Sequence, residues 1–292
     1  MNTPDTSAAT VQTLQGTQFF LYDEVASTMD VCKQLVKRKS GVPSVDSGQL
    51  ELDDVFAVLS KEQHNGRGSR GRTWEGMSGN MFLTVAVKMS RVPCRITLIP
   101  LRVGTLVSPH IRSRVQTANM QTYLKWPNDV LIGKEKVCGT IVEIEDDRVL
   151  IGIGCNVARA PTVPTAGDDA GRDATCLAAH SAEVAADPEA YLSLAADIAA
   201  DVRSWASAAA AATATASDAN SVSVNGGQIM EEAEVVVKKF EGQMDLSSAQ
   251  RLRSGDDAGK QVLPLQVNSD GTLRVRVKET GEERTLVVEY LW

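Results

Sequence analysis

The sequence is poor in the side chains that usually hold zinc. Its only histidines are His64, His110 and His180, and no two of its cysteines are spaced as CxxC. A zinc site is therefore not expected. Scattered thiols without such spacing suit a reducing compartment, and those inside apolar runs are expected to be small buried hydrophobic residues. The five cysteines are Cys32, Cys94, Cys138, Cys155 and Cys176.

The chain also lacks any apolar run close to the roughly 18 residues that a membrane span needs. Residues 1–18 contain neither Lys nor Arg, unlike a signal or transit peptide, and we expect them to form a disordered tail. Lys and Arg number 30 against 37 Asp and Glu, so the net charge is −7. Chains that bind nucleic acid are usually basic. The sequence therefore predicts a cytoplasmic protein that binds neither DNA nor a membrane.

The order of apolar patterns predicts an α+β fold, a mixed β-sheet with helices packed on it. Strand-like runs dominate the middle of the chain without the regular alternation of a doubly wound sheet. We expect one main domain over residues 19–206 and a low-complexity linker or insert over 207–229, where Ala, Thr and Ser predominate. Alternating apolar and charged residues with glycine turns then predict a small barrel-like β domain over 230–292.

The stretch from Gly66 to Trp74, GRGSRGRTW, is the most unusual in the chain. Three glycines and three arginines share its nine positions. Glycines allow a close backbone approach to a ligand, successive N–H groups can surround an anion, and arginine forks match carboxylate or phosphate. A mobile basic surface loop without a ligand explains such a cluster about as well as an anion-binding loop does. Whether the rest of the chain supplies further residues of a binding site decides between these two interpretations.

Two further motifs stand where predicted strands end, and they carry a family resemblance. They are KWPNDVLIGKEKVCGTIVE from Lys125 to Glu143 and GIGCNV from Gly152 to Val157. Together with GRGSRGRTW, and with Ser27-Thr28 ahead of a predicted helix, they resemble the biotin–protein ligase family. The resemblance covers residues 19–157 strongly and the C-terminal part more loosely. It implies a catalytic domain like that of class II synthetases, followed by an SH3-like β-barrel.

The resemblance implies a two-step reaction. Biotin and ATP give biotinyl-5′-AMP, and the biotinyl group then passes to a lysine of a biotin carboxyl carrier domain of a carboxylase, of the acetyl-CoA carboxylase type. Because a carboxylate and a triphosphate are both anions, cations must neutralise the negative charge that develops when they react. Mg²⁺ on the phosphates would add to the positive charge of the protein's arginines and lysines. No metal ligand of the protein itself is assigned. The oligomeric state is left open between a monomer and a homodimer.

Site residues follow from the resemblance, position by position. The catalytic residues expected are Lys136, Asp129 and Arg67. The residues expected to bind biotin are Ser27, Thr28, Gln63, Arg67, Gly68, Ser69 and Lys136. The residues expected at ATP or the adenylate are Arg70, Arg72, Trp74, Lys125, Asn128 and Asn156. An incoming lysine amine is almost wholly protonated at pH 7, and we hypothesise that Asp129 orients or deprotonates it.

Several positions in these motifs also have a simpler interpretation. Ser27 is a good helix N-cap without a ligand, and Asp30 could complete a capping box with it. Gly152 and Gly154 could be ordinary strand glycines that pack close to a neighbour. Without KWPND ahead of it, Lys136 would be one solvated lysine of a charged turn, equivalent to Lys134.

One position departs from the family pattern. Ser69 stands where many relatives have an arginine that is associated with retention of the adenylate. The resemblance therefore leaves open whether Arg70 or Arg72 takes that role.

Two alternative functions fit these motifs less well. A lipoate–protein ligase shares the fold, but its Arg-Arg…Ser-Gly-Gly-Gly pattern does not match GRGSRGRTW. A biotin-responsive regulator without ligase activity would be expected to carry a DNA-binding domain, and the 18 or so residues ahead of the first predicted strand are too few for one. A P-loop nucleotide-binding module is excluded because GxxxxGK[ST] is absent.

Overall fold

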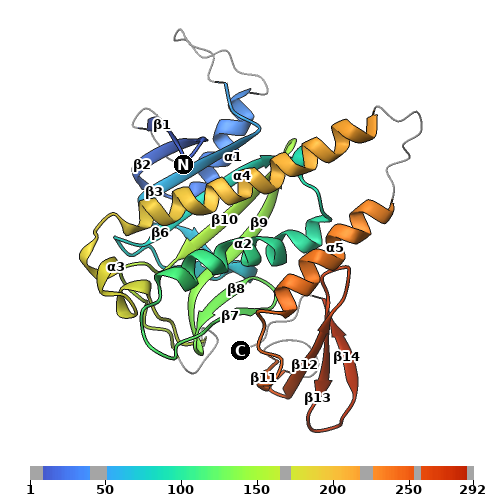
Figure 1. Cartoon of the computed structure of the whole chain (residues 1–292). Coiled ribbons are helices and arrows are strands. Elements are labelled where there is room, and N and C mark those ends of the chain that lie inside the picture. Colours follow the sequence, from blue (N-terminus) through green and yellow to red (C-terminus); the bar gives the residue numbers. More distant parts are fainter. Residues whose placement is uncertain (1–8, 40–50, 165–171, 218–225, 253–257, 288–292) are drawn as a thin grey trace.

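The structure is a computed structural model of the chain, and it describes residues 9–39, 51–164, 172–217, 226–252 and 258–287. An eight-stranded mixed sheet lies at its centre, with helices on both faces (Figure 1). The α+β fold expected from the sequence is confirmed. Within the described ranges, no helix combines the length and the apolar character that crossing a membrane requires.

The central sheet has the strand order β1-β2-β3-β6-β10-β9-β8-β7. Only β2 and β3 run parallel; the other neighbouring pairs are antiparallel. The strands are β1 Thr10–Leu14, β2 Thr17–Val25, β3 Val55–Gln63, β6 Met81–Lys88, β7 Thr122–Lys125, β8 Asp129–Ile132, β9 Glu135–Glu145 and β10 Arg148–Cys155. A two-stranded ribbon, β4 Gly66–Arg67 with β5 Thr73–Trp74, stands beside the sheet.

The central strand β3 shows why the sheet is covered on both faces. Its residues are buried almost without interruption, and side chains alternate between the two faces of a strand. Ala57 and Leu59 join the larger apolar core, whereas Phe56 and Val58 join the smaller one. A continuous apolar run is therefore what this strand needs.

The helices divide between these two cores. α2 (Ile99–Arg114) and α4 (Ala190–Ser217) lie on the face of the larger core, with the short α3 (Ala182–Ala186) nearby. α1 (Thr28–Lys39) covers the opposite face and packs on β3, β6 and β10. The start of α1 is therefore placed on the face that carries the candidate site.

The C-terminal part begins with a helix, not with strands. α5 (Gly226–Glu241) packs on α2, and its Ala233, Val236 and Phe240 are buried. A four-stranded antiparallel sheet follows, made of β11 Gln250–Arg251, β12 Gln261–Val267, β13 Leu273–Val277 and β14 Glu283–Leu286. A small barrel-like β domain was expected over 230–292, but residues 230–241 belong to α5, and among the described residues the strands form an open sheet without the closure of a barrel.

Two expectations about chain segments are corrected by the helices and strands. Residues 10–18 do not belong to a disordered tail, because β1 pairs with β2 through a two-residue turn in which Gln15 and Gly16 have positive φ, as such hairpins require. Residues 207–217 are not a linker but the end of α4, and 226–229 begin α5. Alanine is the best helix former, so the Ala-rich stretch continues the helix before it. Residues 1–8 and 218–225 lie outside the described residues.

Candidate active site

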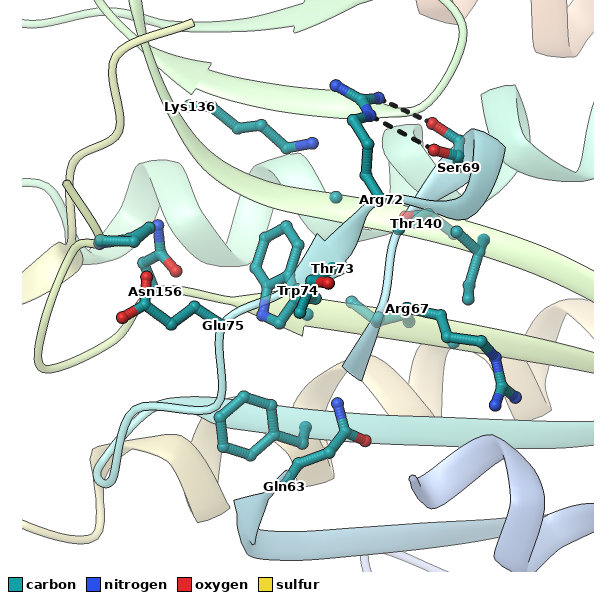
Figure 2. A pocket seen from close by; sticks show the side chains of 18 of the residues that line it. Gln63, Arg67, Ser69, Arg72, Thr73, Trp74, Glu75, Lys136, Thr140 and Asn156 are labelled. Atoms are coloured by element: carbon teal, nitrogen blue, oxygen red, sulfur yellow. Dashed lines mark hydrogen bonds between the residues drawn. The ribbon is translucent and has the colours of Figure 1, made fainter. Parts of the chain in front are cut away.

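A cavity of about 690 Å³ opens beside the start of α1, over the ends of β9 and β10 (Figure 2). It is lined by most of the residues predicted from the sequence, which come from five separate parts of the chain. These are Ser27, Thr28, Gln63, Arg67, Gly68, Ser69, Arg72, Trp74, Asn128, Lys136 and Asn156. Lys125 and Asp129 are not in the lining, and the side chain of Arg70 lies outside the described residues.

Thr28 and Gln63 form a fixed polar wall at one side of the cavity. The Gln63 side-chain oxygen accepts from the backbone N–H of Thr28 at 3.0 Å and from its hydroxyl at 3.3 Å. Thr84 donates in turn to the Thr28 hydroxyl at 2.8 Å. Because the oxygen of Gln63 is used in this way, its amide nitrogen is the group that it can offer to a ligand. Thr84 was not predicted, since nothing in the sequence marks a threonine inside an apolar strand.

Arg67 is held by Asp30 of α1. Its guanidinium donates two hydrogen bonds to that carboxylate, at 2.7 and 2.8 Å, and lies 3.8 Å from Glu143. The capping box predicted for Asp30 is therefore wrong, because both of its oxygens serve the arginine. Ser27 does stand directly before the helix, where its carbonyl accepts from Val31 N–H. In this arrangement the positive charge of Arg67 is balanced by the carboxylate of Asp30.

Arg72 folds back over Ser69 at the upper edge of the cavity (Figure 2). Its Nη2 donates to the Ser69 hydroxyl at 2.9 Å, and its Nε donates to the Ser69 carbonyl at 3.3 Å. The Gly68 N–H closes the same turn on the Arg72 carbonyl at 2.8 Å. Ser69 therefore fixes the position of a neighbouring arginine. Of the two arginines that the sequence left open, Arg72 lines the cavity, whereas the side chain of Arg70 lies outside the described residues.

Lys136 receives its position from a buried carboxylate. Asp129 is 1% exposed at its side chain, and its oxygens lie 2.7 Å from Lys136 Nζ and 3.3 Å from Lys125 Nζ. Burial alone would raise the pKa of the Asp129 carboxyl, but the two ammonium groups outweigh it and hold that pKa at about 2. Lys125 is buried as well, whereas Lys136 is 21% exposed and lines the cavity. Lys136 is thus the one of these three groups that can touch a ligand there.

The surroundings of Asp129 argue against the hypothesis that it deprotonates the incoming amine. A carboxylate with a pKa of about 2 has little affinity for a proton near neutral pH, and this one is shielded by two lysines and absent from the lining. Its short distance from Lys136 makes it a positioning residue. Sequence reasoning could not see this, because the pattern KWPND does not tell a buried aspartate from an accessible one.

Trp74 lies across the cavity floor, on two glycines of neighbouring strands. Gly139 and Gly154 are paired between β9 and β10. A Cβ at Gly154 would come within 2.5 Å of the Trp74 ring, and one at Gly139 within 3.1 Å. The Lys136 ammonium is 5.3 Å from the centre of the same ring, within the range of a cation–π contact. The indole Nε1 is buried and has no hydrogen-bond partner among the described residues. Gly154 thus packs close to a neighbour, as its simpler interpretation held, and that neighbour is the Trp74 indole, for which Gly139 also leaves room.

Replacement of Gly154 by alanine is expected to displace Trp74. The added methyl group cannot coexist with ring carbons 2.5 Å away, and overpacking of this kind costs about 1–3 kcal/mol. Tryptophan emission, corrected with a Trp74→Phe variant, should shift to longer wavelength and become more sensitive to acrylamide. Gly152→Ala is the matched control on the same strand, since its Cβ would meet only the flexible side chains of Ile141 and Met29. Equal Trp74 emission in the two variants would contradict this placement.

Two asparagines complete the lining. Asn128 donates from its amide nitrogen to the Thr140 carbonyl, and Asn156 donates to the Thr175 carbonyl at 3.0 Å. Each is thereby left with its amide oxygen as an acceptor for a ligand. Arg172 also lines the cavity, from a loop in which the sequence gave no signal of a site. Among the described residues, no three His, Cys, Asp or Glu side chains converge so as to hold a metal ion.

Comparison with known proteins agrees with this geometry. Residues 33–157 match the model of the biotin/lipoate A/B protein ligase family. A biotin–[acetyl-CoA-carboxylase] ligase of Mycobacterium tuberculosis is 29% identical over 135 residues, which are 46% of this chain and 50% of that protein. The chain thus spans about half the length of this curated relative.

Two solved structures extend the similarity over nearly the whole chain. The biotin protein ligase of Leishmania major in complex with biotinyl-5-AMP is 25% identical, with a TM-score of 0.57 over 92% of this chain and 98% of that one. The biotin protein ligase of Aquifex aeolicus in complex with biotin and ATP shares the fold, with a TM-score of 0.61, 19% identity and coverage of 94% and 98%. The matched region, residues 33–157, holds Lys136 and Trp74, and it is similar to the biotin/lipoate A/B protein ligase family, with biotin protein ligases among the similar proteins.

Proposed function

We propose that the chain is a biotin–protein ligase. It activates biotin with ATP to biotinyl-5′-AMP and transfers the biotinyl group to a lysine of a biotin carboxyl carrier domain. The observation that carries this proposal is the pairing of Lys136 with the buried Asp129 at 2.7 Å. This pairing points one fixed ammonium group into a cavity that also holds the fixed amide of Gln63 and the indole of Trp74. The relatives named above are biotin ligases, one of them with biotinyl-5-AMP bound.

In the first step, a carboxylate oxygen of biotin attacks the α-phosphorus of ATP. The new O–P bond forms as the bond to the bridging oxygen breaks, and pyrophosphate leaves. Lys136 and Arg72 are two of the cations that line the cavity, and we assign them to the reacting phosphate. A cation held in advance at the site of developing charge lowers the barrier without having to reorganise. Mg²⁺ enters here as part of the Mg-ATP substrate.

The remaining assignments follow the walls of the cavity. Ser27, Thr28 and Gln63 face the ureido head of biotin, because they line one wall with hydroxyl and amide groups, of which those of Thr28 and Gln63 are fixed by hydrogen bonds to each other. Trp74, Asn128 and Asn156 face the nucleoside, because an aromatic plane and two acceptor oxygens suit adenine and ribose. Arg67, locked to Asp30, holds the glycine-rich loop against α1.

In the second step, the neutral amine of the carrier lysine attacks the acyl carbon of the adenylate. A C–N bond forms, the C–O bond to AMP breaks so that AMP leaves, and the proton lost by the nitrogen passes to water. Asp129 is not assigned to accept that proton, because its carboxylate is buried and has a pKa of about 2. The described cysteines are all free and buried, which supports the expected reducing, cytoplasmic compartment. The acceptor is proposed to be a carboxylase of the acetyl-CoA carboxylase type.

Mass spectrometry of a carrier domain incubated with the protein, biotin and Mg-ATP tests the proposal. The expected product is the carrier domain with one biotinyl group, and omission of ATP should abolish it. ATP–pyrophosphate exchange separates the alternatives, since biotin should stimulate it and lipoate should not. Stimulation by lipoate alone would favour the lipoate ligase side of the family. Exchange with biotin but without transfer to the carrier would favour a regulator that binds the adenylate.

A further inference from the structure

The C-terminal sheet touches the loop that carries Asp129. The Nε1 of Trp126 donates to the carbonyl of Gly271, in the turn between β12 and β13, at 2.8 Å. Trp126 is 1% exposed, so this hydrogen bond satisfies a buried donor that would otherwise cost free energy. The two residues are 145 positions apart in the sequence. In Figure 1 the C-terminal sheet lies beside β7, at the edge of the central sheet where this loop begins.

The turn is built to hold that carbonyl in place. The Asp270 carboxylate accepts from the Thr272 N–H at 3.0 Å and from its hydroxyl at 2.7 Å, and Asn268 donates to the same hydroxyl at 2.8 Å. Gly271 has a φ of +90°, and a Cβ there would lie 2.9 Å from the carbonyl oxygen of Thr97, just before α2. Glycine is therefore needed both for its backbone conformation and for the close approach to Thr97.

A second contact fixes the chain two residues before Trp126. The N–H of Leu124 donates to the carbonyl of Gln243 at 2.8 Å, and Leu124 forms a parallel bridge with Met244. Glu241, at the end of α5, accepts from the N–H of Val267 at 2.6 Å and so links this segment to β12. The C-terminal part thus holds the chain by its backbone at residue 124 and by a side chain at residue 126.

From Trp126 the connection to the cavity is short. Asn128 and Thr140 are joined by two hydrogen bonds, one from the Asn128 amide and one from the Thr140 N–H at 3.0 Å. Asp129 follows and sets the position of Lys136 at 2.7 Å. A displacement of Trp126 therefore moves the carboxylate that orients the cavity lysine. A misplacement of about 1 Å at a reacting group can cost about 100-fold in rate.

We propose that the turn from Asn268 to Thr272 is a positioning element for the loop from Trp126 to Asp129, so that the C-terminal sheet sets the placement of Lys136 in the cavity. None of the turn residues lines the cavity, and the turn acts through Trp126. The kinetic consequence rests on the proposed function, whereas the structural consequence does not.

Two glycine variants test the proposal. Gly271→Ala places a methyl group against Thr97 and shifts the turn away from Trp126. Gly259→Ala is the matched control, because Gly259 lies in the turn just before β12 of the same sheet, has a φ of +91°, and has no atom of the described residues within 4 Å of the position of a Cβ. Both variants carry the same backbone strain, and only Gly271→Ala disturbs the contact with the catalytic domain.

The first measurement is amide hydrogen exchange of peptides that cover residues 122–133. Exchange should become faster in Gly271→Ala and remain as in the wild type in Gly259→Ala. The second is the single-turnover rate of biotinyl-5′-AMP formation, which should fall about 10- to 100-fold in Gly271→Ala and stay within about twofold in Gly259→Ala. The affinity for biotin should change little in either variant, since its proposed wall comes from α1 and β3.

A double-mutant cycle with Trp126→Phe separates positioning from general destabilisation. The phenylalanine lacks the N–H donor, so adding Gly271→Ala to it should cost much less than Gly271→Ala does alone. Additive effects, or equal exchange and equal rates in the two glycine variants, would overturn the proposal. If the wild type forms no adenylate at all, the proposed function fails, and hydrogen exchange still decides whether the turn holds the loop.

Discussion

Replacing Lys136 by methionine is expected to slow biotinyl-5′-AMP formation by about 10²- to 10³-fold. Methionine keeps the length of the side chain but removes the one ammonium group that the buried Asp129 directs at the cavity. Loss of a single group that stabilises developing charge typically has an effect of this size. The rate is measured in a single turnover, with enzyme in excess over biotin and with Mg-ATP saturating. Equilibrium binding of biotin should change by less than about tenfold, because the ammonium acts on charge that develops in the transition state.

Lys134→Met is the matched control for this variant. Lys134 is exposed in the turn between β8 and β9, two residues before Lys136, and it does not line the cavity. It should keep the wild-type rate within about twofold, as substitutions on an exposed turn usually do. Asp129 retains Lys125 as a partner in Lys136→Met, so the variant should fold, and thermal unfolding verifies this. A slow rate in the control, or a normal rate in Lys136→Met, would remove Lys136 from the mechanism.

The fold class could be read from the sequence because it depends on local patterns. Apolar runs such as the one in β3 indicate strands buried on both faces, and the mixture of elements excludes a doubly wound sheet. The segment around residue 207 could not be read in the same way. Its Ala, Thr and Ser side chains are too small to suggest an element that packs in a core. A helix that starts upstream nevertheless continues through the alanines, because alanine has the most favourable helix propensity. Strand β1 escaped notice because an exposed edge strand has no apolar face to mark it.

The candidate site, like the fold, could be predicted from the sequence only in part. The motifs predicted that Gln63, Trp74, Lys136 and Asn156 lie together, and all four line one cavity. What spacing could not reveal was which partner each charge has. Asp30 was expected to cap a helix and instead binds Arg67. Such pairings depend on side chains far apart in the sequence, and only the packing of α1 against the loop decides them.

The glycines illustrate the same limit. In the sequence, Gly139, Gly154 and Gly271 are three small residues in or near strands. In the structure, the first two accommodate the Trp74 indole and the third approaches Thr97. Each glycine marks a close contact, but the identity of the contact comes from the tertiary fold. The same tertiary contacts tie the C-terminal sheet to the lysine of the cavity, although no motif connects them.

Replacing Asp129 by asparagine is expected to lower the free energy of unfolding by about 3–5 kcal/mol. Asparagine keeps the shape but removes the charge that balances Lys125, whose side chain is 2% exposed. Removing one partner of a buried ion pair leaves the other charge uncompensated, which is the source of this large cost. Urea unfolding measures the change, and the slope of the unfolding free energy against urea concentration should equal that of the wild type. The adenylate rate should fall as well, since Lys136 loses the group that positions it.

Asp23→Asn is the control for Asp129→Asn. Asp23 pairs with Lys61 at the same 2.7 Å, but the two side chains are 87% and 57% exposed. An exposed pair contributes about 0–1 kcal/mol, so this variant should be nearly neutral. Equal losses in the two variants would show that burial of the Asp129 pair does not matter.

The pH dependence gives an independent check on the role of Asp129. The pKa of this carboxyl is about 2 in the folded protein and about 3.9 in an unfolded chain. A folded-state pKa below the unfolded one means that the carboxylate stabilises the fold fully above about pH 4 and loses this contribution as the pH falls toward 2. The difference in unfolding free energy between the wild type and Asp129→Asn should therefore be constant above about pH 5 and become smaller below about pH 4. A difference that instead declines between pH 6 and 8 would mean that Asp129 titrates near neutrality, and would restore it as a candidate base for the transfer step.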